Sequence, residues 1–106
     1  MGLSEEVARS AGIPIVIRGS GEYVCSTNVE RFLREARARG LGVLGLEGFQ
    51  LLKDATIPDM SAILDLSELE RSTNCVDESI DQALSFVRDI NDPGMYFDVT
   101  LEGQSQ

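Results

Sequence analysis

LGVLGLEGFQLLKDATIPDMSAILDL, residues 41–66, is the stretch that decides the fold of this chain. Its two apolar runs flank the polar segment KDATIPD, a pattern typical of two antiparallel strands joined by a turn. The pattern predicts a central hairpin with strands near residues 41–49 and 61–66, and the glycines of the first strand predict a bend near Gly45 or Gly48. The spacing of Met60, Ile63 and Leu64 also permits a short helix over residues 58–66, so strand and helix both remain open for that segment.

The chain on either side of this hairpin repeats a similar order of elements. The tripeptide Ser-Thr-Asn occurs at 26–28 and at 72–74, and Leu-Glu-Gly occurs at 46–48 and at 101–103. The spacing between these marks differs in the two halves, so the pattern indicates a repeat of supersecondary units and not of sequence.

Two segments have the apolar periodicity of helices, at 27–39 and 75–90. The first opens on a capping box formed by Thr27 and Glu30, and the second on Asn74 followed by acidic residues. The outer side of the first helix carries a basic stripe, which suits the helix dipole and also allows docking of an anion or a partner. Its members are Arg31, Arg34, Arg37 and Arg39.

Three further segments complete the predicted fold. Residues 13–17 form a first strand, residues 18–22 a turn, and residues 95–102 a last strand that alternates apolar and polar side chains. The order βαββαβ predicts an α+β two-layer sandwich of the ferredoxin-like split β-α-β type, with a four-stranded antiparallel sheet and both helices on one face. In this arrangement the last strand lies at an edge and the helices run parallel. Residues 1–106 then form one domain, with a short N-terminal helix or arm at 1–12 and a polar tail at 103–106.

Composition restricts the function. Eighteen acidic and nine basic residues give a net charge of -9, which argues against binding nucleic acid through its phosphates. The chain contains no histidine and its two cysteines have no metal-ligand spacing, which excludes zinc sites of the usual Cys/His kinds and the common Ser-His and Cys-His nucleophile pairs. We therefore assign no catalytic residue, no metal ligand and no cofactor. Its apolar runs are too short to cross a bilayer and the segment MGLSEE does not resemble a secretory signal. We therefore expect a cytoplasmic protein with no membrane association.

The two cysteines occupy equivalent places in the repeat, because Cys25 precedes the first helix and Cys75 lies in the first turn of the second. Parallel helices would bring both thiols to one end of the domain, where a redox pair is conceivable. Two free thiols are the expectation for a reducing cytoplasm.

Period-two alternation predicts the residues on the sheet face away from the helices. If Met95, Phe97, Val99 and Leu101 point inward, as do Leu44, Leu46, Ala62, Leu64 and Leu66, then a cluster of carboxylates points outward with Ile63, and Arg18 falls between acidic neighbours. The candidate partner-binding residues on this face are Glu47, Asp65, Tyr96, Asp98, Glu102 and Arg18. Crowding of like charges should raise the pKa of some of these carboxyl groups.

These observations favour a small acidic protein-binding module, of the kind expected of an inhibitor or immunity-type protein that neutralises a basic partner. One alternative is a small-ligand regulatory domain acting as a homodimer, with close backbone approach at glycines 40, 42, 45 and 48. Another is a metal-dependent enzyme that uses Glu47, Asp65 and Asp98 as oxygen ligands or as acid and base.

Overall fold

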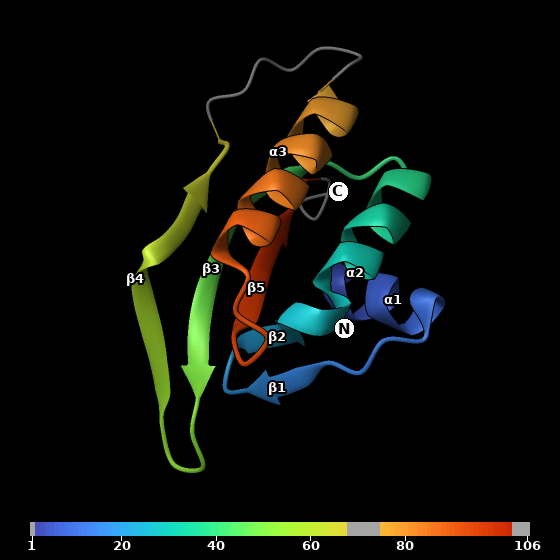
Figure 1. The fold of residues 1–106 in the computed structure, drawn as a ribbon. Coiled ribbons are helices and arrows are strands. Elements are labelled where there is room, and N and C mark those ends of the chain that lie inside the picture. Colours follow the sequence, from blue (N-terminus) through green and yellow to red (C-terminus); the bar gives the residue numbers. More distant parts are fainter. Residues whose placement is uncertain (1, 68–74, 103–106) are drawn as a thin grey trace.

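A computed structural model describes residues 2–67 and 75–102 of the chain. Three helices and five strands follow one another along it (Figure 1). In chain order they are α1 (Leu3–Ala11), β1 (Val16–Arg18), β2 (Gly21–Cys25), α2 (Ser26–Ala38), β3 (Val43–Leu51), β4 (Thr56–Asp65), α3 (Cys75–Ile90) and β5 (Tyr96–Leu101). The predicted α+β class is confirmed, and the predicted helices at 27–39 and 75–90 agree with α2 and α3 to within about one residue.

The sheet has the strand order β1-β2-β5-β3-β4, and every neighbouring pair is antiparallel. Since β2 and β3 both run antiparallel to β5, they are parallel to each other, and α2 connects them across β5. By the same reasoning α3 connects the parallel strands β4 and β5 across β3. These two interleaved crossovers, β2-α2-β3 and β4-α3-β5, correspond to the repeat of supersecondary units indicated by the sequence. Residues 72–74 and 103, which carry part of that repeat, lie outside the described part of the chain.

This order corrects the predicted ferredoxin-like sheet in two respects. The sheet has five strands and not four, and the last strand β5 lies at its centre, between β2 and β3, where an edge position was expected. The alternation of residues 95–101 reports only that one face of the strand is covered, which is equally true of a central and an edge strand.

The N-terminal part of the sheet also differs from the prediction. On this side of the sheet β5 pairs with β2, which lies in a segment interpreted from sequence as a turn and its continuation. Residues 13–17 contribute only to the short edge strand β1. The turn itself is confined to Gly19 and Ser20, where Gly19 has a φ of +58°. Because a left-handed φ of this kind favours glycine, Gly19 permits the tight β1–β2 reversal.

The predicted hairpin is confirmed, because residues 56–65 form the strand β4 and pair with β3. Its predicted place at the centre of the sheet is wrong, since β4 lies at an edge. The helical alternative for residues 58–66 is therefore wrong. The register shifts opposite β5 between Val43 and Gly45, and opposite β4 between Glu47 and Phe49. A Cβ on Gly48 would lie 2.5 Å from Met95 Sδ and 2.7 Å from Ala62 Cβ, so this position has room for hydrogen alone.

Helices α2 and α3 pack side by side on one face of the sheet, but they run antiparallel (Figure 1). Glu30 near the start of α2 contacts Arg88 near the end of α3, and Arg37 near the end of α2 contacts Asp77 near the start of α3. The expectation of parallel helices is wrong. Cys25 and Cys75 consequently lie at opposite ends of the helix pair, and the redox-pair hypothesis loses the proximity it requires.

The N-terminal segment is not a loose arm. Val7 and Ala8 of α1 belong to the same buried core as the other helices and the inner face of the sheet. Ser4 of α1 is buried, and its Oγ donates a hydrogen bond of 3.1 Å to the carbonyl oxygen of Val99 on β5. The pairing of β2 with β5 extends only as far as Val24 and Phe97. Ser4 therefore supplies a hydrogen-bond donor to the Val99 carbonyl beyond that pairing, where leaving a buried carbonyl oxygen without a partner would be costly.

Candidate functional site on the open face of the sheet

The face of the sheet away from the helices, called the open face below, presents carboxylates on adjacent strands. Glu47 on β3 is directly opposite Asp98 on β5 and directly opposite Ile63 on β4. Asp98 and its neighbours on β5 alternate as predicted: Phe97 and Val99 are buried beneath the helices, Asp98 is half-buried and Thr100 is exposed. Like charges directly opposite each other in a sheet are unfavourable, so this arrangement reduces the stability of the free chain.

Asp98 is a carboxyl group on the open face whose pKa is raised. Burial raises the pKa of its carboxyl group above the ordinary range, and the negative charges of Glu47 and Glu22 raise it further. Within residues 2–67 and 75–102, neither Glu47 nor Asp98 forms an ion pair with an arginine or lysine. These two carboxylates are therefore available to an external cation.

Asp65 behaves differently, although it lies on the same face at the end of β4. Its Oδ1 accepts a hydrogen bond of 2.9 Å from the backbone N–H of Ser67. Hydrogen bonds from the side chain and the backbone of Ser67 hold the pKa of Asp65 below its usual value. The expected crowding of like charges thus contributes at Asp98, whereas the hydrogen bonds from Ser67 set the direction of the pKa shift at Asp65, which remains ionised to lower pH.

A pocket of about 390 Å³ is lined by residues of β3, β4 and β5 beside Glu47 and Asp65. Its acidic members are Glu47 and Asp65, and most of the rest of its lining is apolar or small: Leu44, Gly45, Leu46, Ile63, Leu64, Ser67 and Thr100. Leu44 was predicted to point inward, but the register shift between Val43 and Gly45 leaves it half-exposed in this pocket and gives the inward position to Val43. A lining that combines apolar residues with two carboxylates suits the long alkyl stem and charged head of lysine or arginine.

Aromatic side chains occupy the other end of the open face. Tyr96 is directly opposite Phe49 on β3, and Phe49 packs edge to face against Tyr23 of β2 at a centroid distance of 5.1 Å. Tyr96 is half-buried. It therefore lies on the predicted face, beside an aromatic pair that sequence reasoning did not anticipate.

Two of the predicted site residues leave the group. Arg18 lies on the edge strand β1, and its Nη1 donates a 3.0 Å hydrogen bond to the carbonyl oxygen of Ala55 in the β3–β4 turn, so it does not lie between acidic strands. Glu102 follows the end of β5 and its carboxylate lies near Gly42 and Ser79, at the end of the sheet beside the start of α3. The prediction for Arg18 depended on the ferredoxin-like strand order, and the prediction for Glu102 depended on alternation continuing past Leu101, where β5 ends.

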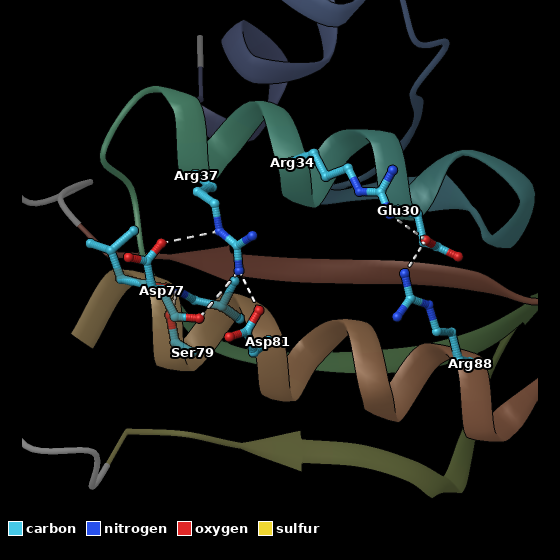
Figure 2. Close-up of polar contacts among 9 residues, drawn as sticks. Glu30, Arg34, Arg37, Asp77, Ser79, Asp81 and Arg88 are labelled. Atoms are coloured by element: carbon cyan, nitrogen blue, oxygen red, sulfur yellow. Dashed lines mark hydrogen bonds and ion pairs between the residues drawn. The ribbon is translucent and has the colours of Figure 1, made fainter. Parts of the chain in front are cut away.

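The arginine stripe of α2 connects the helices to one another (Figure 2). Arg34 and Arg88 share Glu30, and Arg37 contacts both Asp77 and Asp81. Arg31 donates to the carbonyl oxygen of Ala11 and Arg39 to the hydroxyl of Ser10, both in α1. The hydrogen bond from Arg88 lowers the pKa of Glu30. These contacts give the stripe a structural role and leave the docking interpretation without support.

Sequence reasoning missed Glu22, Tyr23, Leu44 and Phe49 as members or neighbours of this site. Strand β2 shows no alternation of burial that could have identified it, because the adjacent residues Tyr23 and Val24 are both buried, and its first residue Gly21 was interpreted as part of a turn. Leu44 could not have been assigned, because a bulge reverses the face of every residue on one side of it.

Other features of the described residues bear on the alternatives. Among residues 2–67 and 75–102, no three His, Cys, Asp or Glu side chains are grouped so that they could hold a metal ion. In the same part of the chain, no helix combines the length and the apolar character needed to span a bilayer.

Neither a protein-family model nor a curated protein matches this chain.

Proposed function

We propose that this chain is a protein-binding module that docks a cationic region of a partner protein on its open face, in the manner of a small inhibitor or immunity-type protein. The observation that carries the proposal is the pair Glu47 and Asp98. These carboxylates face each other across two strands, one of them half-buried with a raised pKa, and neither forms an ion pair within the described residues. A lysine or arginine of a partner would relieve this repulsion on binding.

The adjoining pocket supports a proteinaceous cation over a simple inorganic one. Ile63 and Leu44 provide apolar surface for an alkyl stem, while Glu47 and Asp65 provide acceptors for its charged end. Hard metal ions favour several oxygen ligands converging on one point, whereas Asp65 and Asp98 lie on strands separated by β3. The enzyme alternative with these carboxylates as metal ligands therefore gains nothing from their arrangement.

The rest of the surface is consistent with a single acidic docking side. The helix side neutralises many of its own charges through Arg34, Arg37 and Arg88. A net charge of -9 would steer a basic partner toward the chain from a distance, and uncompensated carboxylates would then orient it on the open face. Fast, salt-sensitive association is the expected kinetic signature.

The test compares two charge-matched double variants. Glu47→Gln with Asp98→Asn removes two charges from the open face, and Glu78→Gln with Asp89→Asn removes one Glu and one Asp charge from exposed positions of α3. The probe is a fluorescein-labelled peptide of alternating lysine and valine, and its anisotropy is followed during titration at low and at physiological ionic strength.

The open-face variant should bind the peptide about fivefold more weakly at low ionic strength, as expected for ~1 kcal/mol from two partly exposed charge pairs. The α3 variant should change the affinity much less, because its charges lie on the other side of the molecule. Equal losses in both variants would mean that net charge alone attracts the peptide, and no loss in the open-face variant would show that this face is not the docking side.

A further inference from the structure

Strand β4 is a long free edge of the sheet. It spans ten residues, Thr56–Asp65, and among the strands of residues 2–67 and 75–102 it pairs with β3 alone (Figure 1). Three of its large apolar side chains are exposed: Met60 by 76%, Ile57 by 46% and Ile63 by 42%. The other edge strand, β1, has three residues. Because an unpaired edge offers a row of backbone donors and acceptors, β4 is the place where another strand could add to this sheet.

The hydrogen-bond pattern shows which backbone groups of β4 face outward. The N–H of Leu66 donates to the carbonyl oxygen of Leu44 on β3, and Leu46 is directly opposite Leu64. Alternation then directs the backbone groups of Leu66 and Leu64 toward β3, and those of Asp65 and Ile63 toward the free edge. The side chains of Asp65 and Ile63 are exposed, and both residues line the acidic pocket.

The rest of the edge is less suitable for strand addition. Pro58 has no N–H to offer, and the N–H of Ser61 already donates to Asp59 Oδ1 at 3.0 Å. Beyond the strand, the N–H of Ser67 is occupied by Asp65 Oδ1. The usable backbone donors at the C-terminal half of β4 are therefore those of Ile63 and Asp65, immediately beside the pocket.

Charge decides what kind of strand fits there. Residues 56–65 contain Asp59 and Asp65 and no basic residue, and Glu47 is the direct neighbour of Ile63 on β3. A second copy of this chain would bring a like-charged strand to the same edge, which is unfavourable. A strand with lysine or arginine at alternate positions would instead place cations beside Asp65. Because neighbouring strands lie ~4.8 Å apart, the long side chains of that strand could also extend across β4 toward Glu47.

We propose that β4 accepts an extended basic segment of the partner as a sixth, antiparallel strand, held by the backbone groups of Ile63 and Asp65. The inference rests on the proposed docking of a cationic partner and specifies how that partner is recognised. Antiparallel pairing continues the arrangement of every other pair in this sheet. In that geometry, residues of the added strand directly opposite Ile63 and Asp65 direct their own N–H groups at β4 and their side chains to the open face. Those residues are the basic ones.

Methylation of backbone nitrogens in the probe peptide tests this arrangement without changing the peptide's charge. One version of the alternating lysine-valine peptide carries a methyl group on the backbone nitrogen of each lysine, and the other carries it on the backbone nitrogen of each valine. The N-methyl-lysine peptide should lose about tenfold or more in affinity, because the donors that face β4 are blocked. The N-methyl-valine peptide should bind like the parent. In the protein, amide hydrogen exchange at Ile63 and Asp65 should slow when the parent peptide is added, while exchange at Leu64 should be slow already.

The other outcomes each overturn a defined part of the account. Equal, salt-sensitive binding of all three peptides would overturn strand addition and leave the proposed acidic docking intact. Binding of none at low ionic strength would overturn both. Weaker binding of the N-methyl-valine peptide alone would overturn the antiparallel geometry. If the free chain sediments as a dimer with Ile63 and Asp65 already protected from exchange, a second copy occupies the edge and the inference is wrong.

Ile63→Pro provides a protein-side control, because it removes an outward N–H while leaving the ladder bonds of Leu64 to β3 in place. A folded Ile63→Pro variant should bind the parent peptide more weakly than the unchanged chain does, because a carbonyl oxygen of the added strand loses the N–H of Ile63 as its donor. If the variant does not fold, the peptide comparison and the exchange measurement on the unchanged chain still decide the question.

Discussion

Neutralising Asp98 should stabilise the free protein, although it removes a group from the proposed binding face. Asp98 is half-buried, and burial together with the charges of Glu47 and Glu22 raises the pKa of its carboxyl group. A carboxyl group with a raised folded pKa binds more protons in the folded state than in the unfolded state. The free energy of unfolding therefore rises as pH falls through the folded pKa, and the increase is complete below the unfolded value of about 3.9.

The size of the effect follows from the cross-strand geometry. Asp98 is directly opposite Glu47, and a like-charged pair in that position costs roughly 0.2–1 kcal/mol. Asp98→Asn should therefore increase the free energy of unfolding at neutral pH by about 0.5 kcal/mol, with relief of carboxylate desolvation adding to this gain. Glu47→Gln should give a smaller gain, because Glu47 is exposed. The double variant should gain less than the sum of the two, with a coupling of about 0.5 kcal/mol.

Urea unfolding of the wild type, both single variants and the double variant at several pH values measures these differences. The advantage of Asp98→Asn over the wild type should shrink as pH falls from about 7 toward 4, because the wild-type carboxyl group then becomes protonated. Effects of other groups, such as loss of the Ser67 hydrogen bonds to Asp65, are common to both proteins and cancel in the difference. A destabilising effect of Asp98→Asn at neutral pH, or strict additivity with Glu47→Gln, would refute the like-charge interpretation of this face.

Three further predictions concern the framework. Gly48→Ala should lower the free energy of unfolding by about 1–3 kcal/mol in urea titrations, because a Cβ there has no space; a change below a few tenths would show that the surrounding side chains yield easily. Ser4→Ala should cost about 1–3 kcal/mol by leaving a buried carbonyl oxygen unpaired, whereas Ser10→Ala, at an exposed serine of the same helix, should cost less than half as much. Mild oxidation should yield no intramolecular disulfide between Cys25 and Cys75, since they lie at opposite ends of antiparallel helices; a disulfide in the monomer, detected by mass spectrometry, would contradict this arrangement.

Local patterns in the sequence were sufficient for some elements and not for their arrangement. The apolar periodicity of residues 27–39 and 75–90 reports contacts within one helix and its covered face, so those helices were predicted with nearly correct bounds. The hairpin at 41–66 was also predicted from a local pattern, two apolar runs on either side of a polar, turn-prone segment. Strand order depends on which distant segments pair, and local patterns do not report that pairing. The ferredoxin-like order assumed for the elements βαββαβ placed the last strand at an edge, whereas β5 pairs with both β2 and β3.

The predicted site residues likewise differ according to whether they depended on a pattern within one strand or on the order of the strands. Glu47, Asp65, Tyr96 and Asp98 lie on the predicted face because each depends only on alternation within its own strand. Arg18 required a neighbouring strand to be identified, and the structure instead pairs its guanidinium with the β3–β4 turn. The directions of the pKa shifts could not be predicted from sequence, because they depend on local contacts: Ser67 lowers the pKa of Asp65, while burial raises that of Asp98.

The claim that the open face is the docking surface is tested most directly by ¹⁵N–¹H NMR during titration with the alternating lysine-valine peptide. The account predicts that the largest amide shift changes occur at Glu47, Ile63, Asp65 and Asp98, and that they diminish as ionic strength rises. Changes concentrated instead on α2 and α3, around the ion pairs of Arg37 and Arg88, would contradict it.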